Sequence, residues 1–237
     1  MTPEALAHKL HQVLGDRLRS VILYGSAAAG DHVGKKSDYN TLVVTTRLGL
    51  DELAALAKPS SAWRKEGNPP PLFFTLDRLQ KSADVFPIEL MDIKESHRVL
   101  YGENVLDSIE VQPENLRLTL ERELKSTLIR LREGFLLTEA RPQRVLDLMV
   151  DSLSTVLVLF RAALRLYQTE VPPLKIDAMK ALTAYVHFDD SVFLQIEDVK
   201  EGRLKPGQIE PLSVFETYLE TVESIVDTVD LHVHSTS

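Results

Sequence analysis

The sequence predicts an α+β fold, with a small mixed sheet and its helices in the first half and a helical bundle in the second. Two observations carry this prediction. Up to Gly102, short apolar segments rich in branched residues alternate with helical stretches. Beyond that residue the chain is patterned as successive helices separated by turn residues such as Pro172-Pro173. We therefore expect two domains, residues 1–112 and residues 113–237.

The first half contains the strands of the expected sheet. Its clearest strand, LRSVILY, is rich in branched residues and ends at Gly25. We expect the helices to pack mostly on one face of the sheet, and Pro59 to end or kink the helix that contains it. The predicted strands are residues 18–24, 39–46, 72–75 and 87–93, and the predicted helices are residues 3–15, 50–65 and 76–83.

The second half is predicted to be a bundle of about five helices. The apolar residues recur at helical spacing, and the stretches between them hold Pro and Gly. No motif in this half rises above a packing pattern. The predicted helices are residues 115–137, 142–168, 176–187, 191–201 and 212–231.

The charge balance narrows the class of ligand. The formal net charge is −8, with 13 Lys/Arg against 15 Asp/Glu in residues 1–112 and 14 against 20 in residues 113–237. Neither half has the basic surface that binding to long nucleic acid requires. A small ligand such as a mononucleotide is easier to reconcile with this balance.

Cysteine content and hydropathy indicate in which cellular compartment the protein is expected. The chain has no cysteine, which excludes disulfides, thiolate nucleophiles and Cys-ligated zinc and fits a cytoplasmic protein. The longest apolar run, Ser152–Leu166, is interrupted by Arg161 and Arg165, so we expect no membrane span. The first residues lack the apolar core of a signal peptide and are patterned as an amphipathic helix.

The segment that carries chemistry is GSAAAGDHVGKKSDYNTLVV, from Gly25 to Val44. A strand ends at its Gly-Ser pair, small residues follow that would open a helix, and a polar loop leads to the next strand. Side chains alternate along a strand, so Asp38, Asn40 and Leu42 share one face.

These residue types suit a nucleoside triphosphate with Mg²⁺. Gly25 lets the backbone approach a phosphate closely, and the Ser26 hydroxyl and the N–H groups of a following helix can donate to phosphate oxygens. Asp38 and Asn40 carry oxygens at positions i and i+2, which can share a Mg²⁺ that takes its other ligands from triphosphate and water.

The segment resembles the signature of the nucleotidyltransferase superfamily related to DNA polymerase β. That signature is an apolar strand, Gly-Ser, a helix-opening segment, and Asp-x-Asp or Asp-x-Glu on the next strand. Among its members, the segment is most similar to the kanamycin-type aminoglycoside and minimal nucleotidyltransferases. The resemblance covers about residues 18–93. It implies a nucleotidyltransferase-like first domain and Mg²⁺-dependent transfer of a nucleoside monophosphate from NTP to a hydroxyl of a small molecule or a protein.

The resemblance also assigns site residues. The family uses a third carboxylate on a later strand, in an apolar-acid-apolar context that Glu89 matches, with Asp92 as a rival on the opposite face of that strand. The resemblance implies catalytic roles for Asp38 and Glu89, with the ligand cleft between the Gly25-Ser26 turn, these two strands and the bundle. The kanamycin-type enzymes build their cleft with a partner subunit, so the resemblance suggests that this chain forms a homodimer. The expected metal ligands are Asp38, Asn40 and Glu89, and the expected nucleotide-binding residues are Gly25, Ser26, Lys36 and Ser37.

Several of these residues have structural alternatives. Gly25-Ser26 alone is also a plain strand-to-helix turn, and Asp38 also suits a cap at the start of a strand. Glu89 is also expected of a solvated or salt-bridged position, and Lys36 of a solvated loop.

The sequence departs from the family pattern at two positions. Asn40 stands where the second carboxylate belongs, and Ala29 where many members carry Arg before Gly. A neutral ligand binds Mg²⁺ less well, so we expect a weakened metal site and a large loss of transfer rate. Three readings stay open: an enzyme of reduced activity, an inactive nucleotide-binding or regulatory protein, and an antitoxin-like protein that binds no nucleotide. The sequence names neither the acceptor nor the base of the NTP.

Overall fold

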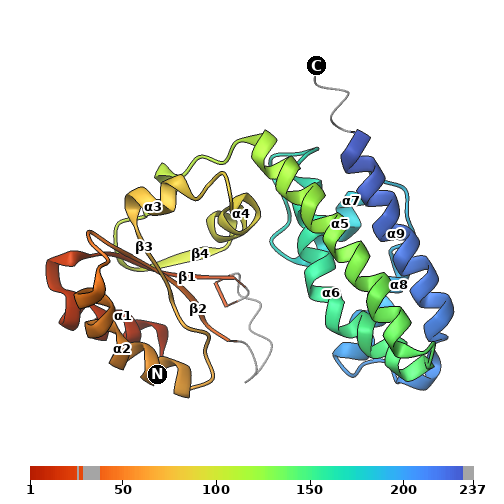
Figure 1. Cartoon of the computed structure of the whole chain (residues 1–237), viewed down its shortest axis with the longest axis horizontal. Helices are drawn as coiled ribbons and strands as arrows, with labels where there is room; N and C mark the ends of the chain where they lie inside the picture. The colour runs from red at the N-terminus through yellow and green to blue at the C-terminus, as the bar shows by residue number, and fades with distance from the viewer. Residues whose placement is uncertain (26, 29–37, 232–237) are drawn as a thin grey trace. The chain divides into compact units, whose positions relative to one another are not determined.

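The structure is a computed structural model that describes residues 1–25, 27–28 and 38–231. The chain forms two compact units, Met1–Gln112 and Pro113–Ser237. In Figure 1 the first unit runs from red to yellow-green, and the second from green to blue.

The first unit is built on a four-stranded mixed sheet, as the sequence predicts. Strand β1 is central and antiparallel to both β2 and β4, whereas β2 is parallel to β3, which gives the order β3-β2-β1-β4. Together with the helices of both units, this sheet confirms the predicted α+β class. The strands are β1 (Leu18–Tyr24), β2 (Asn40–Thr45), β3 (Leu72–Thr75) and β4 (His97–Gly102).

Helices cover both faces of this sheet, so the prediction that they lie mostly on one face is wrong. Figure 1 shows helices α1 (Pro3–Leu14) and α2 (Leu50–Lys65) below the sheet, and α3 (Leu76–Lys81) and α4 (Pro87–Glu95) above it. The strands are apolar on both sides, because neighbours such as Leu42 and Val43 are both buried in separate cores. Each apolar face of a sheet needs its own cover.

The two cores have different partners. The core toward α1 and α2 holds strand residues Val21 and Val43 and helix residues Leu6, Leu10, Leu56 and Trp63. The core toward α3 and α4 holds strand residues Ile22, Leu42 and Val44 and helix residues Leu79, Leu90 and Ile93.

The segment predicted as a fourth strand, residues 87–93, is helix α4 instead. Its buried residues include Pro87, Leu90 and Ile93, which recur every three residues and so line one side of a helix. Pro87 is its first residue, where a missing N–H costs nothing. A short apolar run of this kind is compatible with either a strand or a helix. The prediction that Glu89 is a strand residue is wrong, because this run forms a helix.

The fourth strand follows that helix. Strand β4 begins at His97, in a segment that the sequence pattern did not assign to the sheet, and pairs antiparallel with β1. It ends at Gly102, which has φ +77°, and a Cβ there would overlap the carbonyl oxygen of Arg19 on β1. Only glycine therefore allows the two strands to meet at this point.

The other predicted elements of the first unit are confirmed, with ends that differ by no more than two residues. Helix α2 continues through Pro59 to Lys65, so the proline does not end it. Pro59 is buried on the side of the helix that packs on the sheet.

The second unit consists of helices, and the five predicted helices are all present among the described residues. The ends of α5, α8 and α9 lie close to those predicted, whereas α6 and α7 stop earlier, at Leu164 and Leu182. The helices are α5 (Pro113–Thr138), α6 (Pro142–Leu164), α7 (Lys175–Leu182), α8 (Ser191–Lys200) and α9 (Pro211–Leu231).

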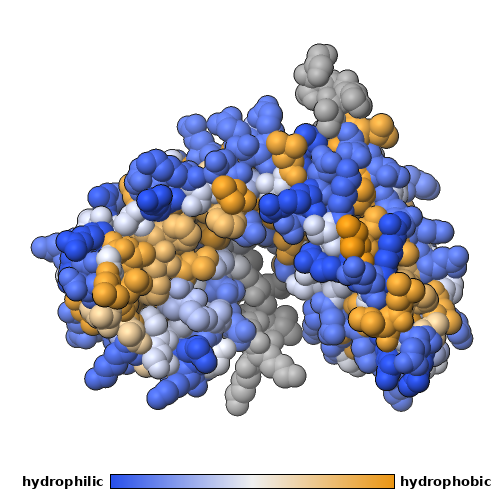
Figure 2. All heavy atoms as spheres, viewed as in Figure 1, coloured by the Kyte–Doolittle hydropathy of each residue, from blue (hydrophilic) through white to orange (hydrophobic). Residues whose placement is uncertain are grey.

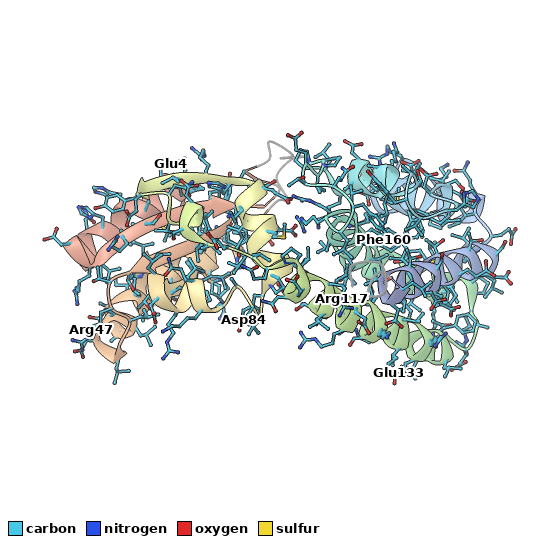
Figure 3. All side chains as sticks on the ribbon, turned by 90° about the horizontal axis from the view of Figure 1, so that it is seen from above. Glu4, Arg47, Asp84, Arg117, Glu133 and Phe160 are labelled. Carbon is cyan, nitrogen blue, oxygen red and sulfur yellow. The ribbon has the colours of Figure 1, made fainter. Side chains whose placement is uncertain are left out.

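The core of the helical unit contains a cluster of aromatic rings around α6. The Phe160 ring, labelled in Figure 3, lies 5.2 Å from the Phe193 ring, which in turn lies 5.0 Å from the Tyr218 ring. The Tyr218 hydroxyl is 3.0 Å from the Ser152 hydroxyl. Burial raises the pKa of Tyr218, so its hydroxyl stays neutral.

Helix α6 holds the longest apolar run of the sequence, yet it carries a buried charge. Arg161 is 4% exposed and donates through Nη1 to the carbonyl oxygen of Pro173 at 3.0 Å. Within the described ranges, no helix combines the length and the apolar character needed to cross a membrane.

The helical unit also exposes apolar side chains near the end of α5 and the start of α9. Leu136 and Leu137 are 75% and 79% exposed. A groove of ≈ 450 Å³ nearby is lined by Phe135, Leu212, Phe215 and other residues of these two helices. Figure 2 shows apolar side chains at the surface of this unit among hydrophilic ones. The predicted homodimer stays a prediction.

Candidate functional site

Three side chains form a row across one end of the sheet. Tyr24, the last residue of β1, pairs with Asn40 on β2 and with His97 on β4. Directly opposed residues point to the same face, and Tyr24 packs against the core beneath α3 and α4. The row Asn40–Tyr24–His97 therefore lies on the α3–α4 face, where β1 ends and β2 begins.

The glycine after β1 brings backbone and side chain together at the Asn40 end of this row. Gly25 has φ +80°, a conformation that other residues adopt only with strain. Its N–H donates to the carbonyl oxygen of Ser96 at 3.1 Å. A Cβ at Gly25 would lie 3.5 Å from Nδ2 of Asn40, so the Asn40 side chain lies alongside the glycine backbone.

The residues just before β2 are held by a buried asparagine. Asn68 accepts a hydrogen bond from the backbone N–H of Tyr39 at 3.1 Å. The Tyr39 ring lies 6.1 Å from the ring of the fully buried Trp63, whose Nε1 donates to the carbonyl oxygen of Pro69 at 3.0 Å. Asp38, the exposed neighbour of Tyr39, is thus attached to an anchored backbone.

The opposite end of the row is fixed by the end of helix α4. Nδ1 of the half-buried His97 is 2.9 Å from the carbonyl oxygen of Lys94. A carbonyl oxygen can only accept, so Nδ1 carries a hydrogen and Nε2 of the neutral ring is left as an acceptor. Between the two ends, burial raises the pKa of Tyr24, which keeps its hydroxyl protonated.

The structure groups some of the predicted site residues and separates another from the sheet. Gly25 and Asn40 lie together where β1 ends and β2 begins, and Asp38 is two residues before Asn40 in the chain. Glu89 is an exposed residue in the first turn of α4, not a strand residue. On a helix, Asp92 lies one turn from Glu89 on the same side, which corrects the predicted opposite faces. Ser26, Lys36 and Ser37 lie outside the described residues.

The sheet itself presents no carboxylate in the described strands. None of the four contains Asp or Glu, and the ionisable members of the row are Tyr24 and His97. Neither was predicted as a site residue, and the place of His97 in the row depends on the pairing of β4 with β1. The only available signal was the branched pair within HRVLYG, which is typical of a short strand.

The donor set at the start of β2 fits one Mg²⁺ better than two. A protein-bound Mg²⁺ commonly has one or two carboxylates and takes its other ligands from substrate phosphates and water. The Asp38 carboxylate and the Asn40 carbonyl oxygen supply a set of that kind, with a single negative charge. In the part of the chain that the structure describes, no three His, Cys, Asp or Glu side chains gather as a metal site.

Sequence comparison finds no relatives: no family model and no curated protein matches the chain. Among solved structures, the chain resembles spectinomycin adenyltransferase AAD(9) from Enterococcus faecialis, determined with ATP and spectinomycin. The two are 13% identical, the match covers 99% of this chain and 100% of the other, and the TM-score is 0.51.

At this level of identity, the likeness establishes the fold and leaves substrates open. Membership of the superfamily that the Gly25–Val44 segment resembles stays a prediction. The closer similarity to kanamycin-type and minimal nucleotidyltransferases stays a prediction. The chain thus has an α+β nucleotidyltransferase fold.

Proposed function

We propose that the first unit binds a nucleoside triphosphate where β1 ends and β2 begins, and that the chain slowly transfers a nucleoside monophosphate from it to a hydroxyl. The observation that supports this most is that Gly25 and Asn40 lie side by side at that end of a nucleotidyltransferase fold, with Asp38 two residues before Asn40. The solved structure with a similar fold was determined with ATP, which makes ATP the first nucleotide to test.

The described residues have distinct parts in this proposal. Gly25 has no Cβ and a positive φ, so phosphate oxygens can approach its backbone closely. Asp38 and the carbonyl oxygen of Asn40 would hold one Mg²⁺ together with the phosphates. That ion would neutralise phosphate charge and orient the triphosphate. Ser26, Lys36 and Ser37 are proposed to donate to the phosphates. The acceptor is proposed to be a small molecule or a protein.

Two features favour slow transfer. Asn40 brings no charge to the metal, and Glu89, the proposed third carboxylate, is on an exposed helical turn instead of a strand. Transfer of a phosphoryl group depends on positioning and electrostatic stabilisation, so a weaker ion site lowers the rate.

The same features support a second candidate function, a nucleotide-binding or regulatory protein that performs no transfer. The neutral Asn40 is the observation that favours it. A rate separates the two candidates: an enzyme releases pyrophosphate from bound ATP in the presence of an acceptor, whereas a sensor binds ATP and releases none.

The binding site can be tested by calorimetric titration of ATP and GTP, with and without Mg²⁺. The variants are Asp38→Asn and, as a matched control, Asp84→Asn, whose exposed carboxylate follows α3 and is labelled in Figure 3. We expect Mg²⁺-dependent binding that Asp38→Asn weakens by about tenfold or more, because it removes the only full charge among the described ligands. Asp84→Asn should bind like the wild type. Equal affinity in all three proteins, or no binding in any, would contradict the proposed site.

A further inference from the structure

In the described row Asn40–Tyr24–His97, one side chain is suited to accept a proton from an acceptor hydroxyl. The four described strands carry no carboxylate. Tyr24 is partly buried, and burial raises the pKa of its hydroxyl, which keeps its proton. Asp38 is already assigned to the Mg²⁺, which leaves His97, whose imidazole is the side chain most often used as a general base.

The local geometry leaves one ring nitrogen of His97 for this task. Nδ1 donates to the carbonyl oxygen of Lys94 at 2.9 Å, which fixes the ring against the end of α4 and leaves Nε2 as the acceptor. The ring is half-buried, so it is oriented by the protein and still reachable. An oriented base of this kind is what general base catalysis requires.

The register also places His97 at a useful spacing from the phosphate end. His97 and Asn40 are on the same face, separated by the single strand β1. Two strand spacings amount to roughly 10 Å. A triphosphate at Asn40 and an acceptor hydroxyl above Tyr24 would fit within that span, with Nε2 on the far side of the hydroxyl.

We infer that His97 is the general base of the transfer, in place of the carboxylate that the sheet lacks. The inference rests on the proposed function. The acceptor oxygen forms a bond to the α-phosphorus, and the bond from that phosphorus to the bridging oxygen breaks. Pyrophosphate leaves with the electron pair, and the proton of the acceptor hydroxyl passes to Nε2 of His97, which becomes an imidazolium.

Several charged or titratable groups lie on the elements next to His97. On α4 these are Asp92, Lys94 and Glu95, and on β1 the ionisable neighbour is Tyr24. The Lys94 ammonium group donates to a backbone carbonyl at 2.6 Å, which directs its charge to that carbonyl. The experiment must therefore show that a change in the pH dependence of the transfer rate is caused by the His97 side chain itself.

The test compares His97→Gln with His8→Gln, a matched change at an exposed histidine of α1. Both substitutions are made in the full chain that also carries Asn40→Asp, which adds a second carboxylate to the proposed Mg²⁺ site. Formation of AMP from ATP and Mg²⁺, with water as the acceptor, is followed against pH. We expect the rate of the parent to rise with pH, because only a neutral imidazole can accept the proton. His97→Gln should lower the rate by about 10²-fold or more and flatten this rise, while ATP affinity stays within about twofold.

Several outcomes would overturn the inference. They are an unchanged pH profile in His97→Gln, an effect of His8→Gln equal to that of His97→Gln, and no AMP formation by a parent that binds ATP.

A second measurement separates this inference from the proposed function. In an NMR spectrum of the histidine rings of the wild type, adding ATP and Mg²⁺ should move the His97 signal and leave the His8 signal in place. ATP binding with an unmoved His97 signal would overturn the role of His97 and keep the proposed site. Absence of ATP binding would overturn both.

Discussion

Replacing Asn68 with alanine is expected to loosen the segment that carries Asp38 and Asn40. The Asn68 side chain is 7% exposed and is the acceptor for the backbone N–H of Tyr39 at 3.1 Å. Removing a buried acceptor leaves its donor without a hydrogen bond, which costs about 1–3 kcal/mol. For a unit of this size, each kcal/mol corresponds to roughly 4–8 °C in the midpoint of thermal unfolding.

The protein contains its own reporter for this change. Trp63 is the only tryptophan, it is 0% exposed, and its carbonyl oxygen is 3.5 Å from Nδ2 of Asn68. Trp63 fluorescence during denaturation with urea therefore follows the first unit alone. Gln80→Ala is the control, because this side chain bonds Ser108 at the surface of α3 and its loss should cost within about 0.5 kcal/mol.

The same variant connects stability to the site. Asn68→Ala should also weaken Mg²⁺-dependent ATP binding, because Tyr39 lies between Asp38 and Asn40 in the chain. If Asn68→Ala unfolds at the same urea concentration as Gln80→Ala and binds ATP like the wild type, Asn68 does not hold the start of β2.

Two further predictions concern the first unit. Gly102→Ala should destabilise this unit by about 2–5 kcal/mol, the sum of a strained positive φ and the overlap with the carbonyl oxygen of Arg19. Unfolding followed by Trp63 fluorescence measures the loss of stability. A loss below about 1 kcal/mol would show that β1 and β4 tolerate a side chain there. The hydrogen bond from the Gly49 N–H and, to a lesser extent, the Arg17 guanidinium hold the pKa of Glu52 below its usual value. Its stabilising contribution is therefore present above its unfolded pKa of about 4.3 and is lost as pH falls through the lower folded pKa. Glu52→Gln should flatten this acid limb of the stability curve, and an identical limb in both proteins would contradict the assignment.

The part of the site that could be predicted from sequence is the part that is local in the chain. Gly25 and Asn40 follow from a strand, a glycine and a second strand within one segment, and β1 and β2 pair directly as antiparallel neighbours. Alternation along the second strand predicts Asp38 and Asn40 on one face, but β2 begins at Asn40, so the direction of the Asp38 side chain stays a prediction.

The contribution of β4 could not be predicted in this way. His97 belongs to the row only because β4 pairs with β1, and no local pattern specifies that register. The β1–β4 pair also requires Gly102 at the point of closest approach to Arg19, a constraint that is visible only once the two strands are brought together.

Helix α4 shows a different kind of ambiguity. The run Ile88-Glu89-Leu90 alternates like a strand, yet its buried residues continue to Ile93 with helical spacing. Pro87 suits the first residue of either element. The presence of helices on both faces of the sheet was easier to predict from the sequence. Consecutive apolar residues such as Leu42 and Val43 indicate a strand that is buried on both sides, as both residues are in the structure.

The central claim is that the end of β1 and the start of β2 form a nucleotide site whose activity is limited by the neutral Asn40. Calorimetry with ATP and Mg²⁺, followed by measurement of pyrophosphate release, should be carried out on the wild type and on Asn40→Asp. We expect Asn40→Asp to bind ATP with Mg²⁺ about tenfold more tightly, which corresponds to about 1.4 kcal/mol, and to release pyrophosphate faster. Equal affinities and equal rates in the two proteins, or no ATP binding by either, would contradict it.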